Sequence, residues 1–358
     1  MPATTGMKGA GYYDQHSTAQ LATIYALQDW IEAAVANLPL PAPAQPVTVL
    51  DLGSSEGRNA IHAMATIVAG LRRRTAQPIQ TIYSDLSSNN FNQLFANVEK
   101  ARCAGLIPAG VYASAVGGSF YGPLLPPGTV HFAACFSAIQ WLDQLPAEPV
   151  PDFVAYRRPH PPRPGLAVSP EATAAFKGQA EQDLVRFLEC RARELVPGGK
   201  LLLVSPGDTD QARMSDGAAD VLNDACLDLV ADGRLEREQY ERLTLPVYFR
   251  TVAELLAPWE VEDSPVRDVF AIDRAESLEV PTPFFIEFRR GNVAAYANAY
   301  TGFMRAVSEP VVRAALQQPD QEEAIVESLY ERIRARLLAE PERYLFRLIL
   351  VAILLTRR

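Results

Sequence analysis

Short hydrophobic runs alternate with longer segments of helical periodicity over most of the chain. The hydrophobic runs predict strands at 47–52, 81–85, 110–115, 130–136, 200–205 and 345–356. Helices are predicted between them at about 59–74, 90–104 and 171–195. Strands that are hydrophobic throughout and alternate with helices indicate an α/β fold, in which helices cover both faces of a doubly wound parallel sheet.

Two segments break this alternation. Residues 151–170 carry six prolines and predict an irregular loop. Residues 207–258 are charged and helix-prone without a strand, which indicates a helical cap over the open end of the sheet, and the mainly helical residues 280–338 are expected to add to it. We therefore predict a cofactor-binding core at 1–206, a cap insertion at 207–258, and a return to the core at 259–358.

Composition narrows the possible partners and the compartment. The chain has 358 residues, with 33 Lys and Arg against 42 Asp and Glu, so its net charge of −9 and its lack of a basic block disfavour nucleic-acid binding. No secretory signal pattern opens the sequence, and the longest apolar run has eight residues, too few for a membrane span. Four cysteines without a C-x-x-C pair indicate neither a zinc site nor disulfides. We expect a cytoplasmic protein without a membrane or nucleic-acid partner.

Candidate chemistry lies where the first two strands end. The first strand runs into Asp51-Leu-Gly-Ser-Ser-Glu-Gly57 and then opens a helix, which places backbone N–H groups at the carboxyl edge of the sheet, where α/β folds bind ligands. The second strand ends at Asp85, whose carboxylate is positioned to accept both hydroxyls of a ribose. Glycines at this spacing also serve ordinary tight turns, but together with Asp85 they predict a nucleotide-type cofactor.

The identity of that cofactor follows from what the loop lacks. Neither G-x-G-x-x-G nor G-x-x-x-x-G-K-[ST] occurs there, which disfavours dinucleotides and ATP. S-adenosylmethionine has a ribose and an adenine but no phosphate, and its cationic methionyl end suits a loop that carries Asp51. The later Pro197-Gly-Gly199 turn into a buried strand resembles that of class I methyltransferases with a Rossmann-like sheet.

Several motifs then resemble those of the plant SABATH methyltransferases, which esterify salicylate, benzoate and jasmonate or methylate ring nitrogens in the caffeine pathway. The similar segments are Met7-Lys8-Gly9 with Tyr13, Ser17 and Gln20; Asp51 to Asn59; Ser84 to Asn92; Val116 to Gly122; His131 to Pro146; and Arg305 to Pro310. They occur in the family's order from one end of the chain to the other.

The resemblance implies a role for each matching residue. The residues implied to bind S-adenosylmethionine are Tyr13, Ser17, Asp51, Gly53, Asn59, Asp85, Leu86, Ser119 and Phe120. Asp85 would hold the ribose, and Leu86 and Phe120 would border the adenine. Gln20 and Trp141 would hold the acceptor carboxylate through an amide and an indole N–H, and are the implied catalytic residues. Lys8 and Tyr13 would close the site, with Lys8 near the substrate.

Two departures from the family pattern concern the acceptor. Ser137 stands where the family often has a pocket tyrosine, and Gln140 where an apolar residue is common. Both are expected to contact the substrate and to make its pocket larger and more polar. Phe284 and Phe285 are further candidates for facing the acceptor. No local cluster of ligand-type residues indicates a metal, and none is predicted.

Three functions remain open from the sequence. The first is methyl esterification of a small aromatic or hydrophobic carboxylic acid, which is already ionised at pH 7 and requires no general base. The second is methylation of a ring nitrogen, and the third is a relative that binds the cofactor or a ligand without catalysis. Two neutral N–H donors favour the carboxylate over a nitrogen acceptor. The resemblance also implies a homodimer.

Overall fold

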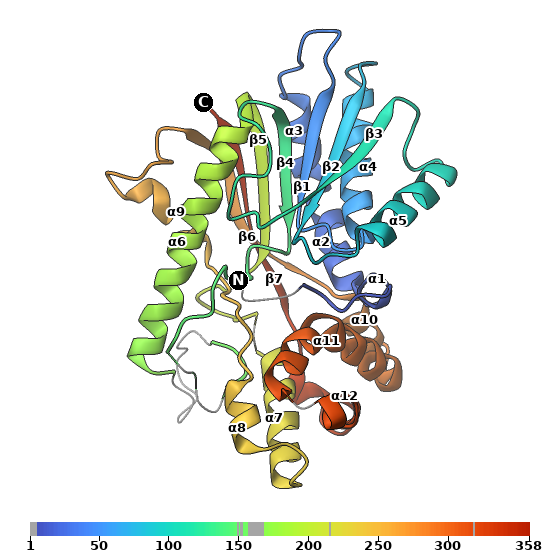
Figure 1. The fold of residues 1–358 in the computed structure, drawn as a ribbon, viewed down its shortest axis with the longest axis vertical. Helices are drawn as coiled ribbons and strands as arrows, with labels where there is room; N and C mark the ends of the chain where they lie inside the picture. The colour runs from blue at the N-terminus through green and yellow to red at the C-terminus, as the bar shows by residue number, and fades with distance from the viewer. Residues whose placement is uncertain (1–5, 149, 151–152, 157–167, 215, 318) are drawn as a thin grey trace.

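One sheet of seven strands organises the computed structural model, which describes residues 6–148, 150, 153–156, 168–214, 216–317 and 319–358 (Figure 1). The strands are β1 (Val47–Leu52), β2 (Ile79–Asp85), β3 (Val111–Gly117), β4 (Val130–Phe136), β5 (Leu195–Pro206), β6 (Phe270–Val280) and β7 (Leu348–Arg357). Their order is β3-β2-β1-β4-β5-β7-β6. The first five run parallel, and β7 lies antiparallel between β5 and β6.

The predicted α/β fold is confirmed, but the prediction of a wholly parallel sheet is wrong at β6 and β7. The hydrophobic pattern also does not predict β6. This strand forms the outer edge of the sheet, and most of its side chains between Phe270 and Val280 are exposed or only partly buried. A strand at the edge of a sheet is less covered by neighbouring elements, so its side chains can be polar. β6 therefore lacks the continuous hydrophobic run by which β7 was predicted.

Two hydrophobic cores lie on opposite faces of the sheet. Val49 points into the core shared with α3 (Gln28–Ala36), α4 (Arg58–Arg72) and α5 (Phe91–Cys103). Its neighbour Leu50 points into the core shared with α6 (Pro170–Glu194) and α9 (Val252–Glu260). Successive side chains of β1 thus point to opposite faces of the sheet, and helices pack on both faces, which is the doubly wound arrangement.

The helices begin at sequence signals that fix their position. Asn90 caps α5 by accepting a hydrogen bond from the Gln93 N–H, and Ser169 caps α6 by accepting one from the Ala172 N–H, with Pro170 at its first turn. Of the predicted proline-rich loop, residues 151–152 and 157–167 lie outside the described residues. None of the helices in the described part of the chain combines the length and hydrophobicity needed to cross a bilayer.

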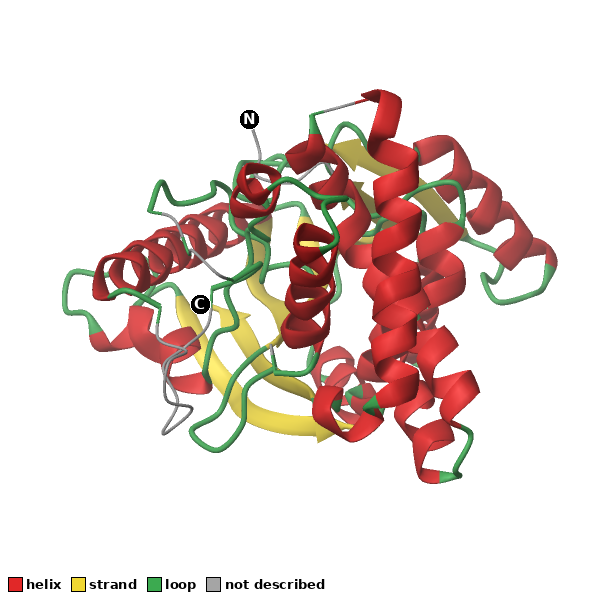
Figure 2. Ribbon diagram, turned by 90° about the horizontal axis from the view of Figure 1, so that it is seen from below, coloured by secondary structure: helices red, strands yellow, loops and turns green. Residues whose placement is uncertain are grey.

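A helical cap lies below the carboxyl ends of the parallel strands (Figure 1). It contains α7 (Ala218–Ala231), α8 (Arg237–Arg242), α10 (Pro283–Arg289), α11 (Val293–Leu316), α12 (Pro319–Ala339) and the 3-10 turn Pro341–Tyr344. Figure 2, a view from below, shows cap helices in front of part of the sheet. The short helices α1 (Tyr12–His16) and α2 (Thr18–Ala26) lie between cap and sheet. The predicted division of the chain into a core, a cap insertion and a return to the core, with boundaries at 206 and 258, stays a prediction.

Candidate active site

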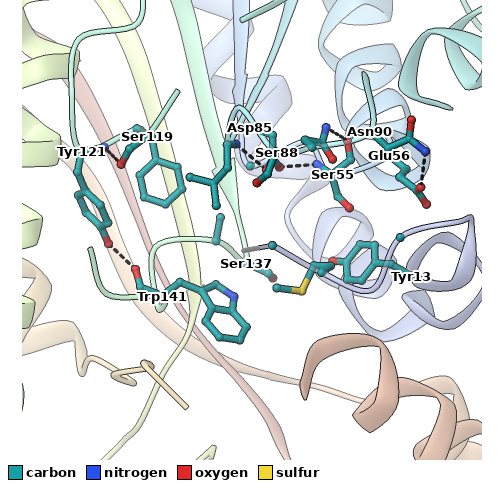
Figure 3. Close-up of a pocket in the computed structure, with 18 of the residues that line it drawn as sticks. Tyr13, Ser55, Glu56, Asp85, Ser88, Asn90, Ser119, Tyr121, Ser137 and Trp141 are labelled. Atoms are coloured by element: carbon teal, nitrogen blue, oxygen red, sulfur yellow. Dashed lines mark hydrogen bonds between the residues drawn. The ribbon is translucent and has the colours of Figure 1, made fainter. Parts of the chain in front are cut away.

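Three cavities meet at the carboxyl edge of the sheet, under the N-terminal segment. The first, of about 280 Å³, lies beside the ends of β1, β2 and β3 (Figure 3). The second, of about 110 Å³, extends toward the cap, and the third, of about 20 Å³, lies above α2. Tyr13 lines all three, so the cavities surround that side chain.

The loop after β1 depends on glycine at one position. Gly53 has a φ of +93°, and a Cβ added there would lie 2.5 Å from the Cβ of Ala138. Any larger residue would therefore push this loop away from the turn that follows β4. This close approach packs the loop that follows Asp51 against the turn that precedes Trp141.

Asp51 is a buried carboxyl group whose one side-chain hydrogen-bond donor among the described residues is the Ser54 hydroxyl, at 2.6 Å. Burial, with a smaller contribution from the charge of Asp85, raises the pKa of Asp51 to about 7, and the Ser54 hydrogen bond opposes this shift. No Lys, Arg or His is among the described residues that line the third cavity with Asp51. The site therefore holds a potential negative charge without a protein cation.

Asp85 at the tip of β2 is held by the backbone. Its two carboxylate oxygens each accept a bond of 2.7 Å, one from the Ser55 N–H and one from the Leu86 N–H. Burial raises the pKa of Asp85, while these two bonds oppose the shift. Figure 3 shows the carboxylate at the wall of the first cavity, beside Ser55 and Ser88. Further lone pairs remain for a ligand that donates hydroxyl groups.

Two buried amide oxygens at the third cavity have no partner among the described residues. They are Oδ1 of Asn59 and Oε1 of Gln20. The Asn59 amide is oriented by Ser17, because its Nδ2 donates to the Ser17 hydroxyl at 3.0 Å and to the Ser17 carbonyl at 3.1 Å. Its oxygen is thereby left as an acceptor, and with Asp51 the cavity offers three acceptors to a ligand.

The second cavity is largely apolar. Helix α11 of the cap supplies Phe303, Met304 and Val307 to its wall. Phe249 comes from the segment before α9, Phe346 from the segment before β7, and Met7 from the N-terminal segment. Its polar groups belong to Tyr13, Gln20, Thr23, Ser137, Gln140 and Trp141. No Asp, Glu, His, Lys or Arg is found among its described lining residues. It offers hydrogen bonds to a small ligand but no charge.

Met7, Tyr13, Ser137 and Trp141 line both the first and the second cavity. Trp141 is fixed from behind, because its carbonyl accepts a 2.7 Å bond from the Tyr121 hydroxyl and its backbone N–H donates to the Ala138 carbonyl. In Figure 3 its indole ring turns away from Tyr121 and into the site. A group transferred between ligands in the two cavities would pass these four side chains.

Comparison with known proteins decides the nature of this region. Residues 3–358 match a family model described as SAM dependent carboxyl methyltransferase, where SAM is S-adenosylmethionine. The chain belongs to this family. The predicted resemblance to the SABATH methyltransferases is thereby confirmed, as is the cofactor.

Relatives of this carboxyl methyltransferase match over most of their length. It is 29% identical to indole-3-acetate O-methyltransferase 1 of Arabidopsis thaliana, over 92% of this chain and 88% of that protein. It is 26% identical to salicylate carboxymethyltransferase of Clarkia breweri, over 87% of this chain and 88% of that protein. The solved structure of loganic acid methyltransferase with SAH is similar at a TM-score of 0.80, with 25% identity and 98% of both chains covered.

The residues present fit S-adenosylmethionine. Three acceptors without a protein cation suit its α-ammonium group, which has three N–H donors. Asp85 offers its carboxylate to the ribose, and Leu86 and Phe120 provide apolar surface in the same cavity for the adenine. Among the described residues, no group of three or more His, Cys, Asp or Glu gathers as metal ligands would.

The structure brings most of the predicted site residues of the methyltransferase to the three cavities. Those that line at least one are Tyr13, Gln20, Asp51, Gly53, Asn59, Asp85, Leu86, Ser119, Phe120, Ser137, Gln140 and Trp141. Ser17 lines none of the three and instead orients Asn59. Lys8 also lines none of them. Its ammonium pairs with the buried carboxylate of Glu309 on α11.

The N-terminal segment is fastened on two sides. Glu309 also binds Arg305 at 2.6 Å and Arg313 at 2.8 Å, so one carboxylate joins Lys8 to the cap. On the sheet side, the buried Glu56 accepts a 2.8 Å bond from the Gly11 N–H. These contacts hold Gly6, Met7 and Gly9 at the wall of the first cavity.

The sequence analysis did not identify the residues of α11 that line the second cavity. Phe303, Met304 and Val307 lie on one face of α11. The first two directly precede the Arg305 to Pro310 motif and Val307 lies within it, so this motif is the signal that pointed to them. Phe284 and Phe285 line none of the three cavities. Phe284 is buried behind the wall, where it stacks on Tyr300 with ring centroids 5.1 Å apart.

Proposed function

We propose that this enzyme methylates the carboxylate of a small acid with an aromatic or hydrophobic body. The observation that carries the proposal is the apolar second cavity, which joins the cofactor-sized first cavity at Met7, Tyr13, Ser137 and Trp141. Its volume of about 110 Å³ and its Phe and Met walls suit a flat or aliphatic ring system. Relatives named for indole-3-acetate, salicylate and loganic acid support a small carboxylic acid as the acceptor.

The absence of charge in the described lining of that cavity favours a carboxylate over other acceptors. A phenol or a ring N–H must lose a proton before it attacks a methyl group, and no carboxylate or histidine is found among the described residues of this cavity to take it. Burial raises the pKa of Tyr13, so its hydroxyl stays protonated and is no base either. A carboxylic acid is an anion at pH 7 without help.

The side chains then orient and desolvate the anion. Bound S-adenosylmethionine supplies an electrophilic methyl group on a positively charged sulfur. The Gln20 amide and the Trp141 indole each offer one N–H to the carboxylate, which places an oxygen at the junction of the cavities. Two neutral donors leave the oxygen more reactive than an ion pair with Lys or Arg would. Met7 and Tyr13 close the junction against water.

Methyl transfer from labelled S-adenosylmethionine to aromatic, indolic, fatty and dicarboxylic acids tests this function, with xanthines as nitrogen acceptors. Base-labile ester from an aromatic or hydrophobic acid is the expected product. In Trp141→Phe, which keeps an aromatic ring and loses the indole N–H, kcat/KM for that acid should fall about tenfold to a hundredfold, while the affinity for S-adenosylmethionine changes little. Stable N-methyl product alone, or no product from any acid, would refute the proposal.

A further inference from the structure

Gln140 is a buried polar side chain at the second cavity, where the acid is proposed to bind, and the oxygen of its amide lacks a hydrogen-bond donor among the residues that the structure describes. It is 8% exposed, and its Oε1 has no hydrogen-bond partner among the described residues. Buried carbonyl oxygens are nearly always paired, so an unpaired one beside a cavity points to a ligand. Ser137 at the same wall also has a buried hydroxyl oxygen without a partner in the described part of the chain.

The turn after β4 fixes the orientation of the Gln140 amide at the cavity wall. Its Nε2 donates a 2.8 Å bond to the Ser137 carbonyl. Ser137 itself is fixed in the left-handed region, with φ of +53°, and its N–H donates to the Val204 carbonyl at 2.8 Å. Rotating the Gln140 amide by 180° would set two carbonyl oxygens against each other. The oxygen is therefore the end left for a ligand, and it can only accept.

We infer that the acceptor acid carries a hydrogen-bond donor on its body, a hydroxyl or a ring N–H, which Gln140 Oε1 accepts. This inference rests on the proposed esterification and narrows its substrate class. The carboxylate is anchored by N–H donors at Gln20 and Trp141, and the body by an acceptor at Gln140. An acid without the donor leaves the buried Oε1 of Gln140 unpaired, so its kcat/KM should be lower than that of an acid with the donor.

Pairs of acids that differ only in the donor test the inference in the full-length enzyme. Indole-3-acetate is compared with its 1-methyl derivative, and phenylacetate with its 2-, 3- and 4-hydroxy forms. At least one donor-bearing acid should exceed its donor-free partner in kcat/KM by about tenfold to a hundredfold. In Gln140→Met, which conserves volume and removes the carbonyl, that ratio should fall to about one.

A matched control comes from the same cavity. Thr23 lines it too, and its hydroxyl donates a 2.6 Å bond to the Gln20 carbonyl but keeps lone pairs that can accept, so an acid ratio in Thr23→Val equal to that of the wild type would assign the accepting role to Gln140 rather than to Thr23. Thermal melting and the affinity for S-adenosylmethionine verify that Gln140→Met is folded. If it is not, the wild-type ratios over the two acid series still decide the question.

The outcomes separate the two proposals. Esters formed equally well from donor-bearing and donor-free acids would overturn this inference, as would a ratio that persists in Gln140→Met. Either result would mean that water or another group satisfies Oε1, and would leave the esterification in place. No ester from any acid would overturn the proposed function and this inference with it.

Discussion

Replacing Asp51 with asparagine should change cofactor binding and stability in opposite directions. The pKa of the buried Asp51 carboxyl is about 7 because of its burial. If its negative charge balances the α-ammonium of S-adenosylmethionine, binding follows the ionised fraction, which is about half at pH 7 and about a tenth at pH 6. The dissociation constant in the wild type should therefore rise about fivefold between pH 7 and pH 6. The ligand's amine, with an ordinary pKa of about 7.7–8.0, stays protonated over this range.

The ligand-free protein should respond the other way. The folded-state pKa of Asp51 is raised from 3.8 to about 7, so this group contributes stability below the unfolded value that is lost as the pH rises through 7. Three pKa units correspond to about 4 kcal/mol at pH 8. The asparagine side chain in the variant D51N carries no charge and still accepts from the Ser54 hydroxyl. D51N should therefore unfold at a higher denaturant concentration than the wild type at pH 8, and at the same one near pH 4.

Calorimetric titration with S-adenosylmethionine at pH 6 and 7, and urea unfolding of the ligand-free protein at pH 4 and 8, measure both effects. D51N should bind weakly, with no change between pH 6 and 7. Asp183→Asn is the matched control, because Asp183 is also buried with a raised pKa but lines none of the three cavities. It should keep the wild-type pH dependence of binding. A D51N protein that is less stable than the wild type at pH 8, or that retains the fivefold change, would refute the reasoning.

Two further predictions concern the loop after β1 and the N-terminal segment. Gly53→Ala should lower the free energy of unfolding by about 2–4 kcal/mol in urea titrations, because its Cβ would lie 2.5 Å from that of Ala138 at a positive φ. Adding Ala138→Gly should restore part of this loss, and no restoration would contradict the contact as its cause. Glu309→Gln should loosen the segment held by Lys8, seen as faster hydrogen exchange of residues 6–16 and about a tenfold lower kcat/KM. Lys8→Met should have the same effect, and exchange as slow as in the wild type would exclude this role for the ion pair.

The cofactor side of the site could be predicted because its residues follow strand ends. Asp51 and Asp85 end β1 and β2, and Ser119 follows β3, so parallel pairing alone places them at one edge. The acceptor side could not be predicted in the same way. Phe284 and Phe303 are both aromatic residues of cap helices, yet only Phe303 reaches the cavity. Which of the two residues reaches the cavity depends on how α10 and α11 pack against each other, and the hydrophobic periodicity of each helix does not predict that packing.

Lys8 illustrates a second limit. Its motif predicts a residue near the substrate, whereas its ammonium binds Glu309, some 300 positions away along the chain. A cation near an anionic substrate and a cation that holds a covering segment give the same local sequence signal. Only the fold, which brings α11 beside the N-terminal segment, distinguishes them.

The position of β7 has a consequence for how the protein reaches its native state. This strand pairs with both β5 and β6, but it is synthesised after β5, the cap helices and β6. Until it emerges from the ribosome, β5 is paired only with β4 and β6 has no partner strand, so backbone N–H and C=O groups of both strands lack their partners in the sheet. The nascent chain therefore passes through a stage that is prone to aggregate, and chaperones that shield strand edges should increase its folding yield.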